Sequence, residues 1–292
     1  MGTVFVLGNA GTDLSLTLTH LALPGETTVA SNGVRAPGGK GLNQAVVAAR
    51  AGARVKFCAP VGNDAEAAFV AECLAAEPLA ELRLMQRPGP TDISVVMVAG
   101  DGENSIVSLC RCADTLSEDE AAAFADEMAS ADWLLLQGNL TAAATLAAMR
   151  AARGRVMLNA APLRWPVTPM LPFCSVVVVN MGEAEAITGL ADPDAAAMAL
   201  RAQGCAIAVI TLGAKGCVWA DAEGLGSLPA IAVHPLDTTG AGDTFCGVLV
   251  ACLASGQHVG NAITAAQKAA ALSVTRLGAY AALPSEAELS GL

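Results

Sequence analysis

Basic residues and histidine are scarce in this sequence. Its 292 residues include 16 Lys and Arg against 27 Asp and Glu, which gives a formal net charge of −11. Nucleic acids and anionic membranes attract proteins through basic surfaces, so the composition argues against both as partners. Only three histidines are present, His20, His234 and His258. They offer little material for a histidine-based metal site or a Ser-His-Asp triad.

Long uninterrupted apolar segments are missing too, although 54% of the residues are hydrophobic. The longest stretch without Asp, Glu, Lys or Arg runs from Thr244 to Gln267, and glycine and serine interrupt it. Its apolar part is shorter than the roughly 20 residues that cross a bilayer. The first strand-like segment, Val4 to Leu7, is also too short for a signal peptide. We therefore expect a soluble, cytoplasmic protein with a substantial core.

The nine cysteines do not form a disulfide or zinc pattern. Their number is odd, and they are scattered through apolar segments, which is typical of reduced thiols in a protein core. Cys110 and Cys112 are the one close pair, and neither a second pair nor a nearby histidine completes a zinc-binding set.

Short β-rich segments alternate with Ala-rich helical segments through most of the chain. This order is typical of βαβ units and predicts an α/β fold with a mostly parallel sheet between helices. The spacing of Ser117 and Glu120 matches a capping box at one helix start. The expected strands are Val4–Leu7, Val55–Pro60, Trp133–Gln137, Val156–Asn159, Ser175–Val179 and Ala206–Thr211. The expected helices are Gly41–Ala51, Asp64–Ala76, Ser117–Met128, Ala142–Ala152, Pro193–Gln203 and Thr244–Ser255.

Two segments depart from this alternation. Residues 92–109 resemble two strands around the sequence Ala99-Gly100-Asp101-Gly102, in which Asp-Gly is a hairpin signal. Residues 14–34 are also strand-like, with Leu14, Leu16 and Leu18 alternating with polar residues. We expect these insertions to form a small β-sheet that projects from the main domain and covers a cleft. An ordinary extension of the main sheet is the alternative.

The strongest local signal for chemistry is the segment 237–245, Asp-Thr-Thr-Gly-Ala-Gly-Asp-Thr-Phe, which precedes an apolar helix. Two glycines around Ala241 let the backbone turn tightly and direct several N–H groups outward at the helix N-terminus. Such amides suit a phosphoryl group, and Asp243 beside them can accept a proton. The alternative is that Asp243 is only a helix cap. The segment is neither a Walker A loop nor a dinucleotide-binding Gly-x-Gly-x-x-Gly turn.

A second glycine cluster, Gly38-Gly39-Lys40-Gly41, also opens a helix. The glycines allow a ligand to approach the backbone closely, while Lys40 and Asn43 offer polar groups that recognise hydroxyls. Asp13, after the first strand, can bind hydroxyls as well. Each of these residues has a purely structural alternative: a solvated lysine, an asparagine that packs a helix start, and a turn aspartate.

Two further strands end in polar or glycine-rich sequence. Asn180 and Glu183 follow an apolar strand, at the edge of a parallel sheet where α/β proteins bind ligands. Glu183 can hold a hydrated Mg²⁺, or it can simply favour a helix N-terminus. The strand before Thr211 leads into Gly213-Ala214-Lys215-Gly216, which suits either a nucleotide or a tight connection.

In this order and spacing, the motifs resemble those of the ribokinase family of carbohydrate and nucleoside kinases, also called the phosphofructokinase B type. The resemblance runs from Val4 to about Pro284. It implies a single domain, residues 1–292, with a three-layer α/β/α architecture, a mostly parallel central sheet and a small β-sheet lid made from residues 14–34 and 92–109.

The resemblance also implies a role for each motif. Asp243 corresponds to the general base, and the amides of Gly240, Ala241 and Gly242 to the anion hole for the moving phosphoryl group. The positions that contact the sugar are Asp13, Gly39, Lys40, Asn43, Asn139 and Asp243. The positions for ATP are Asn180, Glu183, Thr211, Gly213, Lys215, Gly216 and Gln267, with Glu183 holding Mg²⁺ through water. An activating potassium ion would lie near Asp237, Thr239, Ser273, Arg276 and Gly278.

One departure concerns the acceptor. Ribokinases typically have glutamate at the position of Asn139, and asparagine offers a shorter, neutral group. We expect a kinase that transfers the γ-phosphoryl group of ATP to a primary hydroxyl of ribose or a similar pentose. A deoxysugar, a ketohexose or a nucleoside is the alternative acceptor, and a sugar or nucleotide sensor is the non-enzyme alternative. Family members often dimerise through their lids, so a homodimer is expected as well.

Overall fold

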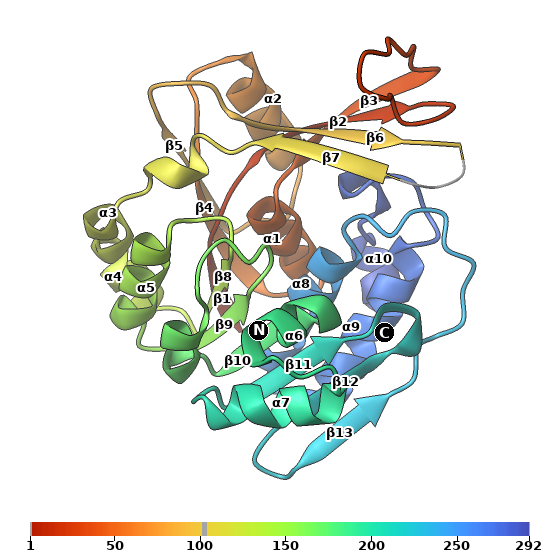
Figure 1. Ribbon diagram of the computed structural model, residues 1–292. Helices are drawn as coiled ribbons and strands as arrows, with labels where there is room; N and C mark the ends of the chain where they lie inside the picture. Colours follow the sequence, from red (N-terminus) through yellow and green to blue (C-terminus); the bar gives the residue numbers. More distant parts are fainter. Residues whose placement is uncertain (1, 101–103, 292) are drawn as a thin grey trace.

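The larger of two sheets forms the centre of the molecule in a computed structural model that describes residues 2–100 and 104–291 (Figure 1). Its strand order is β13-β12-β11-β10-β9-β8-β1-β4-β5. All neighbouring strands pair in parallel except β11–β12 and β12–β13, which confirms the mostly parallel sheet. The strands are β1 Thr3–Leu7, β4 Arg54–Val61, β5 Glu81–Gln86, β8 Trp133–Gln137, β9 Arg155–Asn159, β10 Val176–Asn180, β11 Ile207–Thr211, β12 Cys217–Ala220 and β13 Leu225–Leu228.

Helices cover both faces of this sheet, so the architecture has three layers. In β1, Val4 and Val6 contribute to one apolar core, and Phe5 and Leu7 contribute to the other, because alternate side chains point to opposite faces. The first core is shared with α1 Lys40–Arg50, α2 Ala65–Leu74, α8 Ala241–Ala254, α9 Val259–Ser273 and α10 Glu286–Leu289. The second is shared with α3 Glu118–Ala123, α4 Ala125–Ala129, α5 Ala142–Ala151, α6 Met181–Thr188 and α7 Pro193–Ala202.

The expected small sheet is present as a separate, four-stranded sheet at one side of the molecule (Figure 1). It has the order β3-β2-β6-β7, with β2 Gly11–Thr17, β3 Asn32–Gly38, β6 Asp92–Val98 and β7 Asn104–Leu109. The first insertion is less regular than expected, because residues 18–31 form no strand and β3 continues beyond Val34 to Gly38. The hairpin signal at Asp101 and Gly102 lies outside the described residues.

Two expected helices differ from the structure. The segment Ser117–Met128 is divided into α3 and α4 at Phe124, although its capping box of Ser117 and Glu120 is confirmed. Helix α8 begins at Ala241, three residues before the expected start, because Gly240 adopts the left-handed conformation (φ 79°) and caps it. Asp243 therefore lies inside the first turn of α8, and the interpretation of Asp243 as a helix cap is wrong.

The cysteines agree with the expectation of thiols in the core of the protein. All nine cysteines lie in the described ranges as free thiols, and six of them are buried. Within the same ranges, no group of three or more His, Cys, Asp or Glu side chains is placed to hold a metal ion. None of the described helices combines the length and the apolar character that a membrane span needs.

Candidate active site

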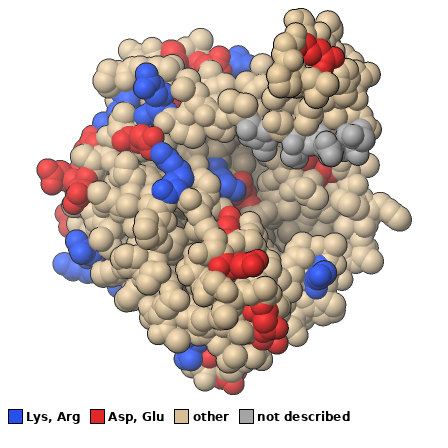
Figure 2. All heavy atoms as spheres, in the orientation of Figure 1, with Lys and Arg blue, Asp and Glu red and all other residues tan. Residues whose placement is uncertain are grey.

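The candidate site lies where the strands of the main sheet end and the small sheet begins. Gln137, Asn159, Asn180 and Thr211 are the last residues of β8, β9, β10 and β11, so polar side chains gather at the carboxyl edge of the sheet. This edge is where α/β proteins bind their ligands. Figure 2 shows a hollow near the centre of the view with basic and acidic side chains inside it.

Asp243 is the most enclosed acidic side chain of the site, with 4% of its surface exposed. Three side chains of α1 surround its carboxylate. Asn43 Nδ2 donates to Oδ2 at 3.2 Å, Gln44 Nε2 donates to Oδ1 at 2.9 Å, and Lys40 Nζ lies 3.7 Å from Oδ1. The two helices can approach this closely because a Cβ at Gly247 of α8 would lie 2.8 Å from the Gln44 backbone oxygen.

The carboxylate of Asp243 favours the charged, protonated form of Lys40. The negative charge of Asp243 raises the pKa of Lys40, against the opposing effect of burial. Glu183 contributes to the same shift, which places its charge near the site as well. Lys40 therefore remains a cation beside Asp243 and can bind an anionic or hydroxylated ligand.

Asp13 of β2 extends into the same region from the small sheet. Burial raises the pKa of Asp13 to about 6, the charge of Asp243 adds to this effect, and a hydrogen bond from Ser94 opposes it. Gly38 of β3 leaves the space for this side chain, since a Cβ there would lie 2.3 Å from Asp13 Oδ2. Gly38 thus lies against the Asp13 carboxylate, and the next residue, Gly39, caps α1.

Asn180 and Glu183 form a capping box at the start of α6. Glu183 N donates to Asn180 Oδ1 at 2.8 Å, and Asn180 N donates to Glu183 Oε2 at 2.8 Å. Glu183 thus stabilises the N-terminus of α6, as the structural alternative for this residue predicted. A magnesium ion commonly binds through one or two carboxylates together with substrate phosphates and water, so the single carboxylate of Glu183 fits such an ion.

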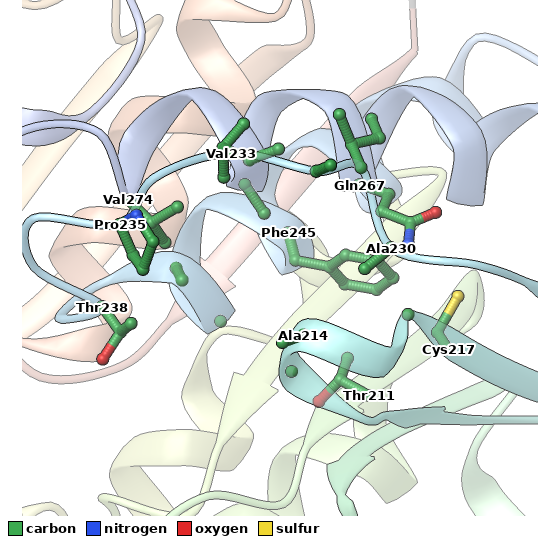
Figure 3. Close-up of a pocket in the computed structure, with 18 residues that line it drawn as sticks. Thr211, Ala214, Cys217, Ala230, Val233, Pro235, Thr238, Phe245, Gln267 and Val274 are labelled. Carbon is green, nitrogen blue, oxygen red and sulfur yellow. The ribbon is translucent and has the colours of Figure 1, made fainter.

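A cavity of about 400 Å³ adjoins the start of α8. Figure 3 shows Phe245 reaching from α8 into the space bounded by Ala214, Ala230 and Cys217. The lining is mostly apolar, and Gln267 Nε2 donates to the Pro229 carbonyl at 2.9 Å, which ties α9 to the chain that follows β13. The expected nucleotide residues Thr211, Gly213, Gly216 and Gln267 line the cavity together with Ala241 and Gly242, whereas Lys215 is exposed outside its lining.

The residues expected near a potassium ion belong to two connected segments. Asp237 Oδ1 accepts a hydrogen bond from Thr239 N, and Asp237 Oδ2 accepts one from Gly278 N, each at 2.9 Å. Ser273 donates to the Ala270 carbonyl, and Arg276 forms an ion pair with Glu288. The side chains of Ser273 and Arg276 are therefore already engaged, and the Asp237 carboxylate joins the two segments.

Asn139 lies two residues beyond the end of β8. Its backbone carbonyl accepts a hydrogen bond from Arg164 Nη1 at 2.7 Å, while its side-chain Oδ1 is buried without a partner. Asn43 Oδ1 is in the same state. Buried polar atoms are usually hydrogen-bonded in native proteins, so these two oxygens each lack a partner that a native protein normally supplies.

Several polar residues of the site were missed by the sequence-based predictions. Gln44 follows the glycine cluster Gly38–Gly41 and has no role in the sequence-based predictions, and Gln137 and Asn159 appear in them only as the ends of strands. All three are buried, and Gln137 Nε2 donates to Gln44 Oε1 at 3.0 Å. The usable signal was an amide side chain within an otherwise apolar segment, because such a group needs a buried partner.

A parallel sheet that presents a carboxylate beside a glycine-capped helix N-terminus and an adjoining apolar cavity is the arrangement of a small-molecule kinase. Comparisons with known proteins agree. The model for "pfkB family carbohydrate kinase" matches residues 1–286. The ribokinase of Haemophilus influenzae is 34% identical, over 98% of this chain and 96% of its own length. The mouse (Mus musculus) ribokinase is 35% identical, over 86% of this chain and 81% of its own.

Solved structures give the same result. A ribokinase from Thermotoga maritima has a TM-score of 0.91 and 28% identity, with 100% of this chain and 99% of the other covered. The chain belongs to the pfkB family of carbohydrate kinases, which confirms the predicted family, the predicted fold and the expectation of an enzyme.

Proposed function

We propose that this carbohydrate kinase transfers the γ-phosphoryl group of ATP to a primary hydroxyl of ribose or a similar pentose. The observation that carries the proposal is the Asp243 carboxylate in the first turn of α8, enclosed by Lys40, Asn43 and Gln44 and next to the glycine-rich start of the helix. Both curated relatives compared above are ribokinases.

In the proposed reaction, the sugar hydroxyl gives its proton to Asp243 while its oxygen forms a bond to the γ-phosphorus. The bond between this phosphorus and the bridging oxygen of ADP breaks. An alkoxide is a better nucleophile than an alcohol, and a positioned base contributes roughly 10² to 10⁴ in rate. The amides of Gly240, Ala241 and Gly242 would stabilise the charge on the phosphoryl oxygens, since they lie at the positive end of α8.

The cavity beside α8 suits the adenosine part of ATP. Its apolar walls match a purine ring, and its position next to Ala241 and Gly242 leads the phosphates towards the start of the helix. Asn180 and Glu183 would bind the phosphates and a hydrated Mg²⁺, which neutralises phosphate charge when it is bound. Thr211, Gly213, Lys215, Gly216 and Gln267 complete this proposed nucleotide site.

We assign the sugar to the space between Asp13 and Asp243. Asp13, Lys40 and Asn43 supply charged and polar groups there, and Gly39 lies at the start of α1 between β3 and the base. An activating potassium ion would be held by carbonyls of the segments that Asp237 joins, with Thr239, Ser273, Arg276 and Gly278 around it. An enzyme that consumes ATP and contains only free thiols suits the cytoplasm.

The acceptor is best tested with a panel of sugars and nucleosides, with ADP release as the measurement. We expect ribose or a similar pentose to give the highest kcat/KM among ribose, deoxyribose, fructose and nucleosides. Because Asn139 replaces a glutamate of typical ribokinases, Asn139→Glu should increase the preference for ribose over 2-deoxyribose by roughly tenfold, the effect of one added charge-assisted hydrogen bond. A higher kcat/KM for a ketohexose or a nucleoside would overturn the pentose assignment.

The sensor alternative is less consistent with the structure. A protein that only binds a sugar does not need a buried carboxylate beside a helix N-terminus, and keeping that charge away from water has a cost in stability. The same panel addresses this alternative, since a sensor would bind a sugar without releasing ADP.

We also propose a homodimer through the small sheet. Leu14 of β2 and Val107 and Leu109 of β7 are exposed, and the strand registers place them on one face. This face is opposite to the one on which Asp13 lies, because neighbouring residues of a strand alternate. The apolar residues Leu14, Leu16 and Leu18 could instead cover the sugar, but Leu14 and Leu16 face away from Asp13, and we therefore favour a second copy of the chain as the partner of this face.

Sedimentation velocity at a series of concentrations tests the dimer. We expect the wild-type protein to sediment as a dimer at micromolar concentration and Val107→Asp to sediment mainly as a monomer, because the new charge would be buried at the interface. An exposed position elsewhere gives the control, for example Met198→Asp on α7. A purely monomeric wild type at all concentrations would contradict the proposal.

A further inference from the structure

A continuous path of buried hydrogen bonds connects the main sheet to the carboxylate of Asp243. Gln137, at the end of β8, donates from Nε2 to Gln44 Oε1 at 3.0 Å, and Gln44 donates from Nε2 to Asp243 Oδ1 at 2.9 Å. Both glutamine residues are fully buried, with 0% of their surface exposed. The three residues are distant in the sequence, so the path exists only in the folded protein.

The orientation of both amides follows from the carboxylate at the end of the path. A carboxylate oxygen accepts hydrogen bonds, so Gln44 has to present its NH₂ group to Asp243. Its carbonyl oxygen then faces Gln137, which in turn has to present its own NH₂ group. Reversing either amide would bring two acceptors or two donors together, and a mismatched buried polar pair is costly.

The path also distinguishes the two oxygens of Asp243. Oδ1 receives the shorter bond, from Gln44, and lies 3.7 Å from Lys40 Nζ. Oδ2 has the longer contact with Asn43 Nδ2, at 3.2 Å. Since Gln44 and Lys40 both lie against Oδ1, Oδ2 is the oxygen that is left to accept a proton from a hydroxyl.

We propose that Gln44, held by Gln137, is a positioning residue that fixes the carboxylate of Asp243 for proton transfer through Oδ2. This inference rests on the proposed function of Asp243 as the base. Gln44 acts by restricting the rotation of the carboxylate and by stabilising its charge in a region that excludes water. Gln137 acts one step further away, by preventing Gln44 from turning its amide.

Gln44→Met tests the role because methionine keeps the shape of glutamine and removes its donor. We expect kcat to fall roughly 10- to 100-fold, in line with the effect of a misplaced catalytic group, while KM for sugar and for ATP changes less than about threefold. The acidic limb of the pH dependence of kcat should move to higher pH, because the carboxylate loses a donor that favours its charged form. Gln44→Glu should move it further, since it adds a like charge.

Gln137→Met tests the second step. Its effect on kcat should be smaller than that of Gln44→Met, and the double variant should be no slower than Gln44→Met alone, because both changes act through one path. Thr145→Val is a matched control in α5, where it removes a buried hydrogen bond from Thr145 Oγ1 to the Thr141 carbonyl at 2.8 Å. This control should lower the melting temperature and leave kcat and its pH dependence unchanged.

Asp243→Asn, measured in parallel with the best acceptor of the panel, separates the two proposals. If Asp243→Asn keeps its turnover, the assignment of the base fails. Two results would overturn the positioning role alone, provided that Asp243→Asn has lost its turnover. In the first, the kcat of Gln44→Met is within twofold of wild type. In the second, the kcat of Gln44→Met falls but the acidic limb of its pH dependence does not move. If Gln44→Met does not fold, as judged by circular dichroism, the kcat and acidic limb of Gln137→Met decide by the same criteria.

Discussion

Replacing Asp243 by asparagine should lower kcat by a factor of roughly 10² to 10⁴, which is the usual contribution of a positioned general base. The amide has the size of the carboxylate and can still accept a hydrogen bond from Gln44, so the packing between α1 and α8 is retained. It cannot take up the proton of a sugar hydroxyl. The amides at the start of α8 would still bind the phosphoryl group, and for this reason some turnover should remain.

The measurement is the rate of ADP release at saturating sugar and ATP. Circular dichroism and the melting temperature of Asp243→Asn show whether the fold is intact, and KM for ATP shows whether the nucleotide site is intact. Asp221→Asn, at a half-buried acidic residue after β12 whose Oδ1 accepts a hydrogen bond from Glu223 N, is a suitable control because the amide can accept the same bond, and it should behave as wild type. Turnover of Asp243→Asn within a factor of ten of wild type would be incompatible with a catalytic base at this position.

Asp243 also shows how far the sequence can be interpreted without a structure. The glycines on both sides of Ala241 predicted a helix N-terminus, and this prediction is confirmed, with Gly240 as the cap. The start of the helix was placed too late, because the segment from Ala241 to Asp243 resembles a loop until the left-handed conformation of Gly240 is known. A positive φ is a property of the folded backbone, and glycine only permits it.

The buried glutamines behind Asp243 could not be predicted, unlike Lys40 and Asn43, which the sequence motifs already placed with Asp243. Gln44 and Gln137 contact each other across 93 positions of the chain, and Gln44 contacts Asp243 across 199. Such pairs depend on the strand order that brings β8 next to β1 and on the packing of α1 against α8. Local patterns predicted the elements, but the order β13 to β5 and the antiparallel edge strands β12 and β13 follow from long-range packing.

The net charge of −11 has to be reconciled with an anionic substrate such as ATP. In the described residues, Lys40 is paired with Asp243 and Arg276 with Glu288, so neither gives an isolated positive charge to the proposed phosphate site. Phosphate recognition would therefore depend on the amides from Gly240 to Gly242, on Mg²⁺ and on the exposed Lys215. Local backbone geometry can achieve this in an acidic protein.

At the carboxylate of Asp13, the proposed function and the stability of the fold make opposite demands. Its pKa is about 6 in the folded protein, above the value of 3.8 for an unperturbed aspartate. Between these two values the folded state binds more protons than the unfolded state, so stability falls as the pH rises from about 4 to 6 and stays lower above it. Asp13→Asn should therefore raise the melting temperature at pH 7.5, and this gain should disappear towards pH 4.

The same substitution should lower kcat/KM for the sugar by a factor of roughly 10² to 10⁴, because two hydroxyl groups would each lose a hydrogen bond to a charged acceptor. The loss should appear in KM for the sugar more than in KM for ATP, since Asp13 lies on β2 and the proposed nucleotide cavity is lined by residues of α8 and α9 instead. Thermal unfolding across the pH range and steady-state kinetics of the same preparation test both effects together. A variant that gains stability and keeps its affinity for sugar would show that the Asp13 carboxylate does not bind the acceptor, and a variant that loses both would show that Asp13 supports the fold of the small sheet.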